Sequence, residues 1–281
     1  MRELAPDLGR AYADAFPLAT GATPASQSPW PLHQAGEALT AFIQANPGTT
    51  SALPYHNQYH FAEAVLAMGT LGAVARDLGL ISPAEAALGV VAMVGHDIGH
   101  DGSSTPGGVL EALAAADTVR ISRIAGVDAD RLDWLAYVIE GTDPGEVAGN
   151  EARTAGFLPP GRFGASADML RSLANEADVL ASLMPHLGLR LGDALAAERR
   201  LAGEPGADGI ASFSGRLAFL RLYAWFTPAA TRMGLPDLVR AQIGRLAAVA
   251  NSLGAGTTPE DGAAALDRME PGEARALFLS S

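Results

Sequence analysis

The sequence predicts an all-α protein, and three observations support this fold class. Alanine and leucine dominate the composition, and aromatic residues make up only 6% of the chain, which favours helices over strands. Apolar residues recur at helical spacing, for example at Phe61, Val65, Met68 and Leu71. No segment shows the alternation that is typical of a strand, and no internal repeat is visible. We therefore expect a helical bundle.

The helices are expected in a simple order along the chain. Residues 1–17 are predicted to form a short helix, and residues 18–31, rich in Thr, Ser, Ala, Gly and Pro, a linker. Ser82 and Glu85 form a capping box with Pro83 at the first helical position, which predicts a core helix ending near residue 96. Residues 144–165 are expected to be irregular. Further helices are expected over residues 39–46, 56–71, 109–124, 130–140, 165–183, 185–201, 213–226 and 239–254, with a short one from residue 258.

The chain of 281 residues is long enough for one large domain or two small ones. We predict an N-terminal extension and linker over residues 1–35, a main domain over 36–254 and a helical tail over 255–281. The N-terminus lacks a basic start followed by an apolar run, so no signal peptide is predicted. The longest apolar run is about a dozen residues, too short to span a bilayer. We expect a soluble cytoplasmic protein without a membrane partner.

The net charge and the lack of cysteine exclude some classes of partner and of metal site. The formal net charge of −12 argues against a nucleic-acid polymer as partner. A small anionic substrate would then depend on local cations at its site. The chain has no cysteine, which excludes disulfides and thiolate metal sites. Any metal must have nitrogen and oxygen ligands, which suits Zn, Mn, Fe, Ni or Mg.

Four of the six histidines lie in two short segments, YHNQYH at residues 55–60 and HDIGH at residues 96–100. If each segment is helical, the four-residue spacing places His56 with His60 on one face, and His96 with His100 on another. Asp97 follows a nearly continuous apolar run over residues 87–95. A buried carboxylate without a partner is unfavourable. A divalent cation shared with histidines would compensate it, so the pattern predicts a metal site.

These motifs resemble the HD superfamily of metal-dependent phosphohydrolases. YHNxxH at residues 55–60 followed by HDxxHxG at residues 96–102 resembles the class I cyclic-nucleotide phosphodiesterases within that superfamily. IEGTD at residues 139–143 resembles the family's Thr-Asp segment, and Ala177-Asp178 resembles the segment with the last metal-binding aspartate. The resemblance spans residues 50–240 and implies the helical bundle of an HD-type phosphodiesterase domain.

The resemblance also implies roles for individual residues. It implies two divalent cations, with a metal-bridging hydroxide as the nucleophile. His56 would be the general acid that protonates the leaving oxygen, and Asp97 would bridge the two cations. The implied ligands of the first cation are His60, His96, Asp97 and Asp178. The residues implied to hold metal-bound waters are His100, Glu111 and Thr142.

The residues that would contact the substrate depart from the family pattern. The glutamine that grips the purine in cyclic-nucleotide enzymes should fall at Arg216. Arg216 is either a bidentate ligand for a phosphate or carboxylate or a residue at the edge of its helix. Paired histidines after the family's glutamate are absent after Glu111. The replaced glutamine argues against cyclic AMP or cyclic GMP as the substrate. Tyr55 and Asn57 are further candidates for substrate binding.

We therefore predict a metal-dependent enzyme that hydrolyses a phosphoester, with a phosphodiester favoured. Two alternatives stay open. An HD-type di-iron oxygenase would have the same ligand residues, and a non-catalytic ligand-binding protein could keep the same scaffold. The retained His56 argues against the second alternative, since a scaffold needs no acid there. The sequence also leaves open the native metal and the formation of a homodimer.

Overall fold

The predicted all-α fold is confirmed by a computed structural model, which describes residues 7–22, 30–46, 53–103, 107–155 and 165–280. Within these residues there is no strand. Residues 1–6 and 23–29, which belong to the predicted N-terminal extension and linker, lie outside the described residues. No helix in the described ranges is long and apolar enough to cross a membrane.

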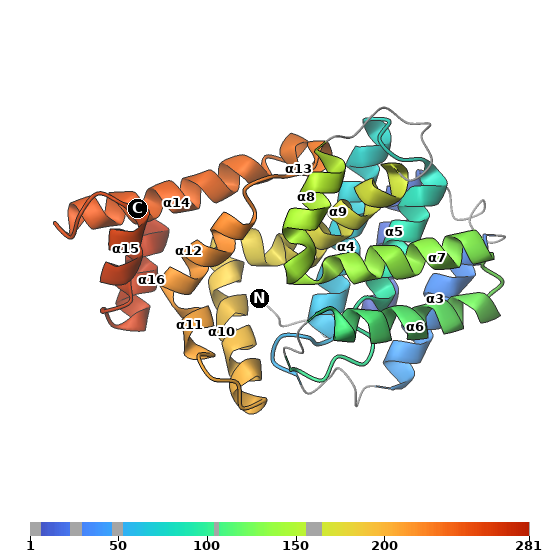
Figure 1. Cartoon of the computed structure of the whole chain (residues 1–281), viewed down its shortest axis with the longest axis horizontal. Coiled ribbons are helices and arrows are strands. Elements are labelled where there is room, and N and C mark those ends of the chain that lie inside the picture. The colour runs from blue at the N-terminus through green and yellow to red at the C-terminus, as the bar shows by residue number, and fades with distance from the viewer. Residues whose placement is uncertain (1–6, 23–29, 47–52, 104–106, 156–164, 281) are drawn as a thin grey trace.

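The N-terminal two thirds of the chain form a bundle, seen on the right of Figure 1. Its helices are α1 (Leu8–Thr20), α3 (Pro31–Ala45), α4 (Gln58–Asp77), α5 (Pro83–Gly95), α6 (Val109–Ile124), α7 (Ala129–Ile139), η2 (Glu140–Thr142), η3 (Pro144–Glu146), α8 (Val147–Thr154) and α9 (Ala165–Leu183). The remaining helices, seen mainly on the left of Figure 1, are α10 (Pro185–Leu201), α11 (Asp208–Ala211), α12 (Phe213–Leu222), α13 (Pro228–Arg232), α14 (Leu235–Ser252), α15 (Pro259–Leu266) and α16 (Pro271–Ser280).

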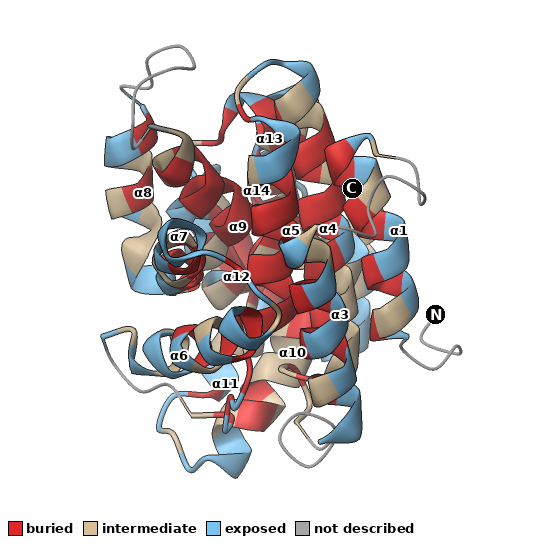
Figure 2. Ribbon diagram, turned by 90° about the vertical axis from the view of Figure 1, so that its right-hand side faces the viewer, coloured by how far each residue is buried: buried red, intermediate tan, exposed pale blue. Residues whose placement is uncertain are grey.

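Helix α5 lies at the centre of the bundle. It begins with the predicted capping box, in which Ser82 accepts from the Glu85 backbone and Glu85 accepts from the Ser82 backbone. All of its residues from 86 to 95 are buried, and Figure 2 shows buried residues concentrated on α4, α5 and α9. A helix that is apolar all round is stable only inside a core. Its C-terminal end therefore carries His96 and Asp97 into the interior.

The prediction that each histidine pair lies on one helix face was wrong. Helix α4 begins at Gln58, after the N-cap Asn57, whose side chain accepts from the Tyr59 backbone N–H. His56 therefore precedes the helix. Helix α5 ends at Gly95, and the chain turns at Gly99, whose φ is 80°, so His100 lies in a loop. The Asn57 cap starts α4 later than the spacing suggested, and the turn that follows Gly95 ends α5 earlier.

The two ends of the chain contribute to the apolar core. In α1, Leu8 and Phe16 are fully buried, and the helix packs against α4. At the other end, Phe278 of α16 is fully buried and its ring lies 5.4 Å from that of Phe213 in α12. Phe213 and Phe278 belong to a second apolar cluster, formed by α10, α12 and α14–α16.

Helix α8 was not predicted, because the sequence analysis expected residues 144–165 to be irregular.

Candidate metal centre

The four predicted metal ligands come together between three segments of the bundle. His60 lies in the first turn of α4, His96 and Asp97 at the end of α5, and Asp178 in α9. The Nε2 atom of His60 lies 2.9 Å from Asp178 Oδ1 and 3.1 Å from Asp97 Oδ2. The two Nε2 atoms of His60 and His96 are 3.2 Å apart. One ligand atom from each of the four residues lies within 4.8 Å of all the others, a group that could hold a metal ion.

The ring of His96 is oriented for metal binding. Its Nδ1 lies 2.9 Å from the carbonyl oxygen of Met93. A carbonyl only accepts hydrogen bonds, so Nδ1 carries the proton and, in the neutral ring, Nε2 keeps a free lone pair. A histidine that donates its other N–H to a backbone carbonyl is the usual arrangement at metal sites. The lone pair points to the carboxylates of Asp97 and Asp178, 3.2 and 3.3 Å away.

The carboxylate of Asp97 provides an independent test of the fit to a cation. Its Oδ2 atom is buried and lies 3.1 Å from His60 Nε2 and 3.2 Å from His96 Nε2, but neither contact in the described part of the chain has hydrogen-bond geometry. A buried, unsatisfied carboxylate oxygen is strongly unfavourable unless a cation binds it. The side chains of Asp97 and Asp178 are 12% and 18% exposed, and that of His60 only 2%. The carboxylates therefore form the open side of the cluster, where a substrate could reach a bound ion.

The charges of the cluster depend on one another. Burial alone would lower the histidine pKa values, but the two carboxylates raise the pKa of His60 to about 9 and that of His96 well above its usual value. Burial alone would raise the aspartate pKa values, but the histidines hold the pKa of both Asp97 and Asp178 well below the usual range. Without a cation the site therefore retains protons, which metal binding would release.

A second possible ligand group shares Asp97 with the first and includes His56 and His100. The rings of these two histidines are stacked, with centroids 3.6 Å apart. The backbone N–H of Gly102 donates to His100 Nδ1 over 2.9 Å, so the neutral ring carries its proton on Nε2. Burial and the charge of His56 lower the pKa of His100 to about 4. At neutral pH, His100 is therefore uncharged and a hydrogen-bond donor.

Sequence reasoning missed a buried carboxylate beside His56. Glu198 of α10 is 1% exposed, and His56 Nδ1 donates to its Oε1. Its Oε2 accepts from the backbone N–H groups of Tyr55 and His56 at 2.8 and 3.0 Å. A signal was present in the sequence: Glu198 follows Leu191 and Leu195 at helical spacing, which places an acid on the inward face of an amphipathic helix.

Of the other predicted site residues, Glu111 lies near the cluster, whereas the polar groups of Thr142 and Asn57 are hydrogen-bonded to the backbone. Glu111 is half-buried, and burial raises its pKa, with further contributions from the charges of Asp97 and Asp178, so it lies near the cluster. Thr142 is buried, and its hydroxyl donates to the Ile139 carbonyl over 2.8 Å. Asn57 is occupied with capping, and its Nδ2 donates to the carbonyls of residues 53 and 54.

Arg216 does not lie at the edge of its helix, which was one of its two predicted arrangements. It is 5% exposed, so it does not lie at a helix edge. Its Nη1 donates to the Ser182 carbonyl, and its Nη2 donates to Gln242 Oε1 over 2.7 Å and to the carbonyl of residue 183 over 3.2 Å. The two Nη atoms are thus occupied, and a bidentate grip on a phosphate would have to break these bonds.

This chain is similar to known proteins in structure and not in sequence. No protein-family model matches the sequence, and no curated protein sequence matches it. The structure is similar to the phosphodiesterase domain of Salpingoeca rosetta rhodopsin phosphodiesterase, with a TM-score of 0.63 and 15% identity over 89% of this chain and 90% of that one. The chain has the fold of phosphodiesterase domains.

Two further structures agree with this assignment. The phosphodiesterase domain of the RhoPDE fusion protein from the choanoflagellate Salpingoeca rosetta matches with a TM-score of 0.61 and 14% identity over 88% of this chain and 90% of that one. LmjPDEB1 in complex with IBMX matches with a TM-score of 0.55 and 17% identity over 99% of this chain and 89% of that one. The predicted phosphodiesterase-like helical fold is thus confirmed.

Proposed function

We propose that this protein is a metal-dependent hydrolase of phosphoesters, with phosphodiesters as the favoured substrate class. One observation carries the proposal. His60, His96, Asp97 and Asp178 form a compact, partly open ligand group, and beside it His56 is held by the buried carboxylate of Glu198. The phosphodiesterase-like fold supports the same reaction class.

The arrangement suits two divalent cations that share Asp97. The first would be held by His60, His96, Asp97 and Asp178, and the second by Asp97 with bound waters. A cation in this position lowers the pKa of a bound water to near neutrality and offsets the negative charge on phosphoryl oxygens. His100 would orient one of these waters, because its Nε2–H is the free donor of a ring that stays neutral at pH 7.

His56 is proposed as the general acid. Its Nδ1 donates to Glu198, which leaves Nε2 to carry a second proton toward the leaving oxygen. The carboxylate fixes the orientation of the ring. The His56 side chain is 12% exposed, so a substrate can reach it while the carboxylate behind it stays dry. General-acid catalysis of this kind contributes on the order of 10²–10⁴-fold to a rate.

The test is a substrate panel on the purified protein, with its metal content measured first. Bis(p-nitrophenyl) phosphate, p-nitrophenyl phosphate, cyclic AMP and cyclic GMP are each incubated with Zn, Mn, Fe, Ni and Mg. We expect hydrolysis of the artificial diester that a chelator abolishes and added metal restores. Less than about half a metal per chain would contradict the proposal and favour a non-catalytic scaffold, because a four-ligand site should bind tightly.

A second arm separates hydrolysis from oxygen chemistry. The protein is loaded with iron and exposed to oxygen together with candidate substrates that contain no phosphate ester. Product formation in this arm, without turnover of any phosphoester in the first, would refute the hydrolase proposal.

A further inference from the structure

Gly102 contacts the ring of His100, and its own conformation is set by its surroundings. The backbone N–H of Gly102 donates to His100 Nδ1 over 2.9 Å. Gly102 has a φ of 86°, and a Cβ on it would lie 2.9 Å from Leu53 Cδ2 and 3.2 Å from Glu198 Cγ. Glycine adopts this conformation readily and leaves this space free. Glycine also has the greatest backbone freedom, so a further contact is needed to hold its peptide groups in place.

Arg199, near the end of α10, supplies such a contact. Its Nη1 donates to the Gly102 carbonyl over 3.0 Å, across 97 positions of sequence. Within the loop, by contrast, Asp101 Oδ1 accepts from the backbone and hydroxyl of Ser103 at 2.8 and 2.6 Å, and these bonds join near neighbours. A charged donor makes a stronger hydrogen bond to a carbonyl than a neutral donor does. Arg199 therefore fixes the loop that carries His100 to α10.

The way in which α10 ends explains the orientation of Arg199. Beyond the helix, Gly203 adopts the left-handed conformation, with a φ of 75°. The N–H of Gly203 donates to the Arg200 carbonyl over 3.0 Å. The N–H of Glu204 donates to the Arg199 carbonyl over 2.9 Å, which completes a Schellman motif. This turn brings Glu204 Oε1 to 3.6 Å from Arg199 Nη1, so the guanidinium lies between that carboxylate and the loop.

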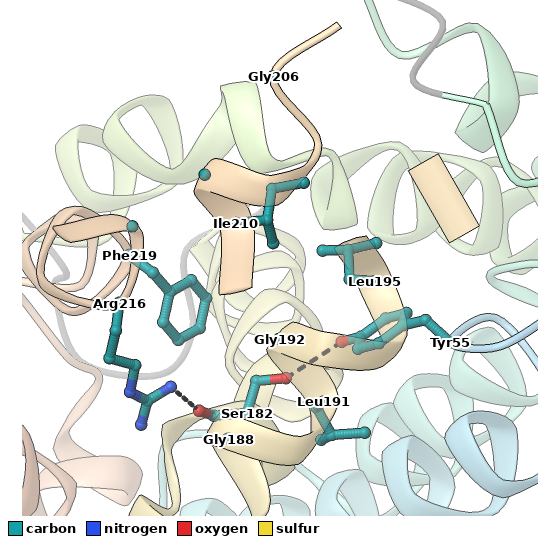
Figure 3. A pocket seen from close by; sticks show the side chains of 12 residues that line it. Tyr55, Ser182, Gly188, Leu191, Gly192, Leu195, Gly206, Ile210, Arg216 and Phe219 are labelled. Carbon is teal, nitrogen blue, oxygen red and sulfur yellow. Dashed lines mark hydrogen bonds between the residues drawn. The ribbon is translucent and has the colours of Figure 1, made fainter. Parts of the chain in front are cut away.

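The preceding residue of α10, Glu198, holds the other histidine of the second ligand group. It accepts from His56 Nδ1 and from the backbone N–H of Tyr55. The Tyr55 hydroxyl lies 3.2 Å from Ser182 Oγ of α9 (Figure 3), so this segment is fixed from a second helix as well. The rings of His56 and His100 are stacked. Two consecutive residues of α10 thus hold the two segments that carry the stacked rings.

We propose that Arg199 is a positioning residue for the metal centre: by holding the Gly102 carbonyl, it keeps the Gly102 N–H on His100 Nδ1 and fixes the tautomer of that ring. A neutral imidazole that accepts at Nδ1 carries its proton on Nε2. The Nε2–H is then the donor available to a metal-bound water. If the Gly102 peptide turned away, Nδ1 could take the proton and Nε2 would become an acceptor. The role of the water rests on the proposed function, whereas the effect of Arg199 on the tautomer does not.

The first test observes the tautomer by NMR. The protein as purified, with its histidine side chains labelled with nitrogen-15, is studied at pH 7 with Zn as the metal, because Zn is diamagnetic. The His100 signal is identified by its absence from His100→Gln. We expect a ring protonated at Nε2 in the wild type and a mixture of both tautomers in Arg199→Met, which removes every donor of the side chain. A wild-type tautomer in Arg199→Met would overturn the proposal.

The second test measures metal content and the steady-state hydrolysis of bis(p-nitrophenyl) phosphate. We expect Arg199→Met to lower kcat about 10- to 100-fold, as for other residues that orient a group at a metal site, with KM and metal content unchanged. Arg199→Lys keeps a charged donor and should recover most of the lost turnover. Arg200→Met is the matched control, because it removes the neighbouring guanidinium, which pairs with Asp208 at the surface. It should change neither readout, and an equal loss in this variant would contradict the role of Arg199.

Other results would also exclude the positioning role. A rise in KM with unchanged kcat would make Arg199 a substrate-binding residue, and loss of metal would show that it acts on the ligands. If Arg199→Met does not fold, Glu204→Ala tests the same link, because it removes the carboxylate beside Nη1 and leaves the arginine in place. This variant should shift the tautomer in the same direction, and an unchanged tautomer would refute the proposal.

The two proposals fail in different ways. A protein that hydrolyses no phosphoester, but whose His100 changes tautomer in Arg199→Met, contradicts the proposed function and supports the positioning role. An active phosphodiesterase in which Arg199→Met keeps both its tautomer and its turnover supports the proposed function and rules out the positioning role.

Discussion

The metal centre and the surroundings of Arg216 compensate their buried charges in different ways. In the metal centre, two histidines lie 2.9–3.3 Å from the carboxylate oxygens of Asp97 and Asp178, and each pair shifts the pKa values of the other. Arg216 is a buried guanidinium whose hydrogen-bond partners among the described residues are all neutral. Charge is thus balanced by ionisable groups in the first region and by neutral dipoles in the second.

This difference separates what is shared with the fold family from what is particular to this chain. In the metal centre, the residues follow the phosphodiesterase-like motifs closely. At residue 216, the chain has an arginine where such motifs lead one to expect a glutamine.

The largest effect is expected for Asp97→Ala. Asp97 belongs to both ligand groups, so its removal should reduce bound metal to under about a tenth of the wild-type content and abolish hydrolysis. Elemental analysis after purification measures the first effect. Asp101→Ala, which removes an exposed carboxylate nearby, serves as the control and should keep its metal. Full metal content in Asp97→Ala would show that this side of the comparison is wrong.

His56→Ala should separate catalysis from metal binding. We expect turnover of the artificial diester to fall on the order of 10²–10⁴-fold, the usual contribution of a general acid, while metal content stays at the wild-type level. His33→Ala, which changes a histidine of α3 away from the site, should alter neither quantity. If His56→Ala loses metal as Asp97→Ala does, His56 is a ligand and its proposed role as the acid is incorrect.

Glu198→Gln tests the carboxylate that orients His56. An amide would turn an N–H toward His56 Nδ1, so the hydrogen bond that orients the ring would be lost. We expect turnover to fall about 10- to 100-fold, as for other residues that orient a reacting group, with metal content unchanged. Steady-state kinetics beside the surface variant Glu260→Gln measure this. Equal turnover in both variants would remove Glu198 from the mechanism.

The smallest effect concerns Glu176, two residues before Asp178 on α9. Its carboxylate accepts from the Thr227 backbone and hydroxyl at 2.6 and 2.7 Å, and no cation is among its partners in the described residues. Burial raises its pKa from 4.5 to about 7, whereas histidines hold the pKa of Asp178 low. The two acids of α9 therefore differ in pKa because Asp178 has positively charged partners and Glu176 has only neutral ones.

A raised pKa in the folded state has a defined consequence for stability. The contribution of Glu176 is fully present below about pH 4.5 and is lost as the pH rises through about 7. Glu176→Gln should therefore be more stable than the wild type at pH 8 by about 1–3 kcal/mol, and the gap should shrink at pH 5. Denaturant unfolding at both pH values measures it. A gap that does not depend on pH would contradict the assigned ionisation.

Part of the fold and of the site could be predicted from the sequence because it depends on residues that are close together in the chain. The helical spacing of apolar residues predicted most helices, and the capping box at Ser82 and Glu85 fixed the start of α5. Asp97 was found because an acid beside an apolar run needs a partner, and Asp178 because its segment resembles the one with the family's last metal-binding aspartate. The helix limits around His56 and His100 were mispredicted, since side-chain caps and glycine turns override spacing. The short helix α8 was missed in a segment of weak apolar periodicity.

The sequence by itself determined the helical class, the residues able to bind a cation and the change at Arg216. Only the tertiary structure decided that Glu198, 142 positions from His56, holds its ring. It also decided that Arg171 pairs with Glu146, whereas Arg216 has no acidic partner among the described residues. The physical reason is that charge compensation depends on distance in space. Packing of α10 and α12 sets those distances, and nothing local in the sequence encodes them.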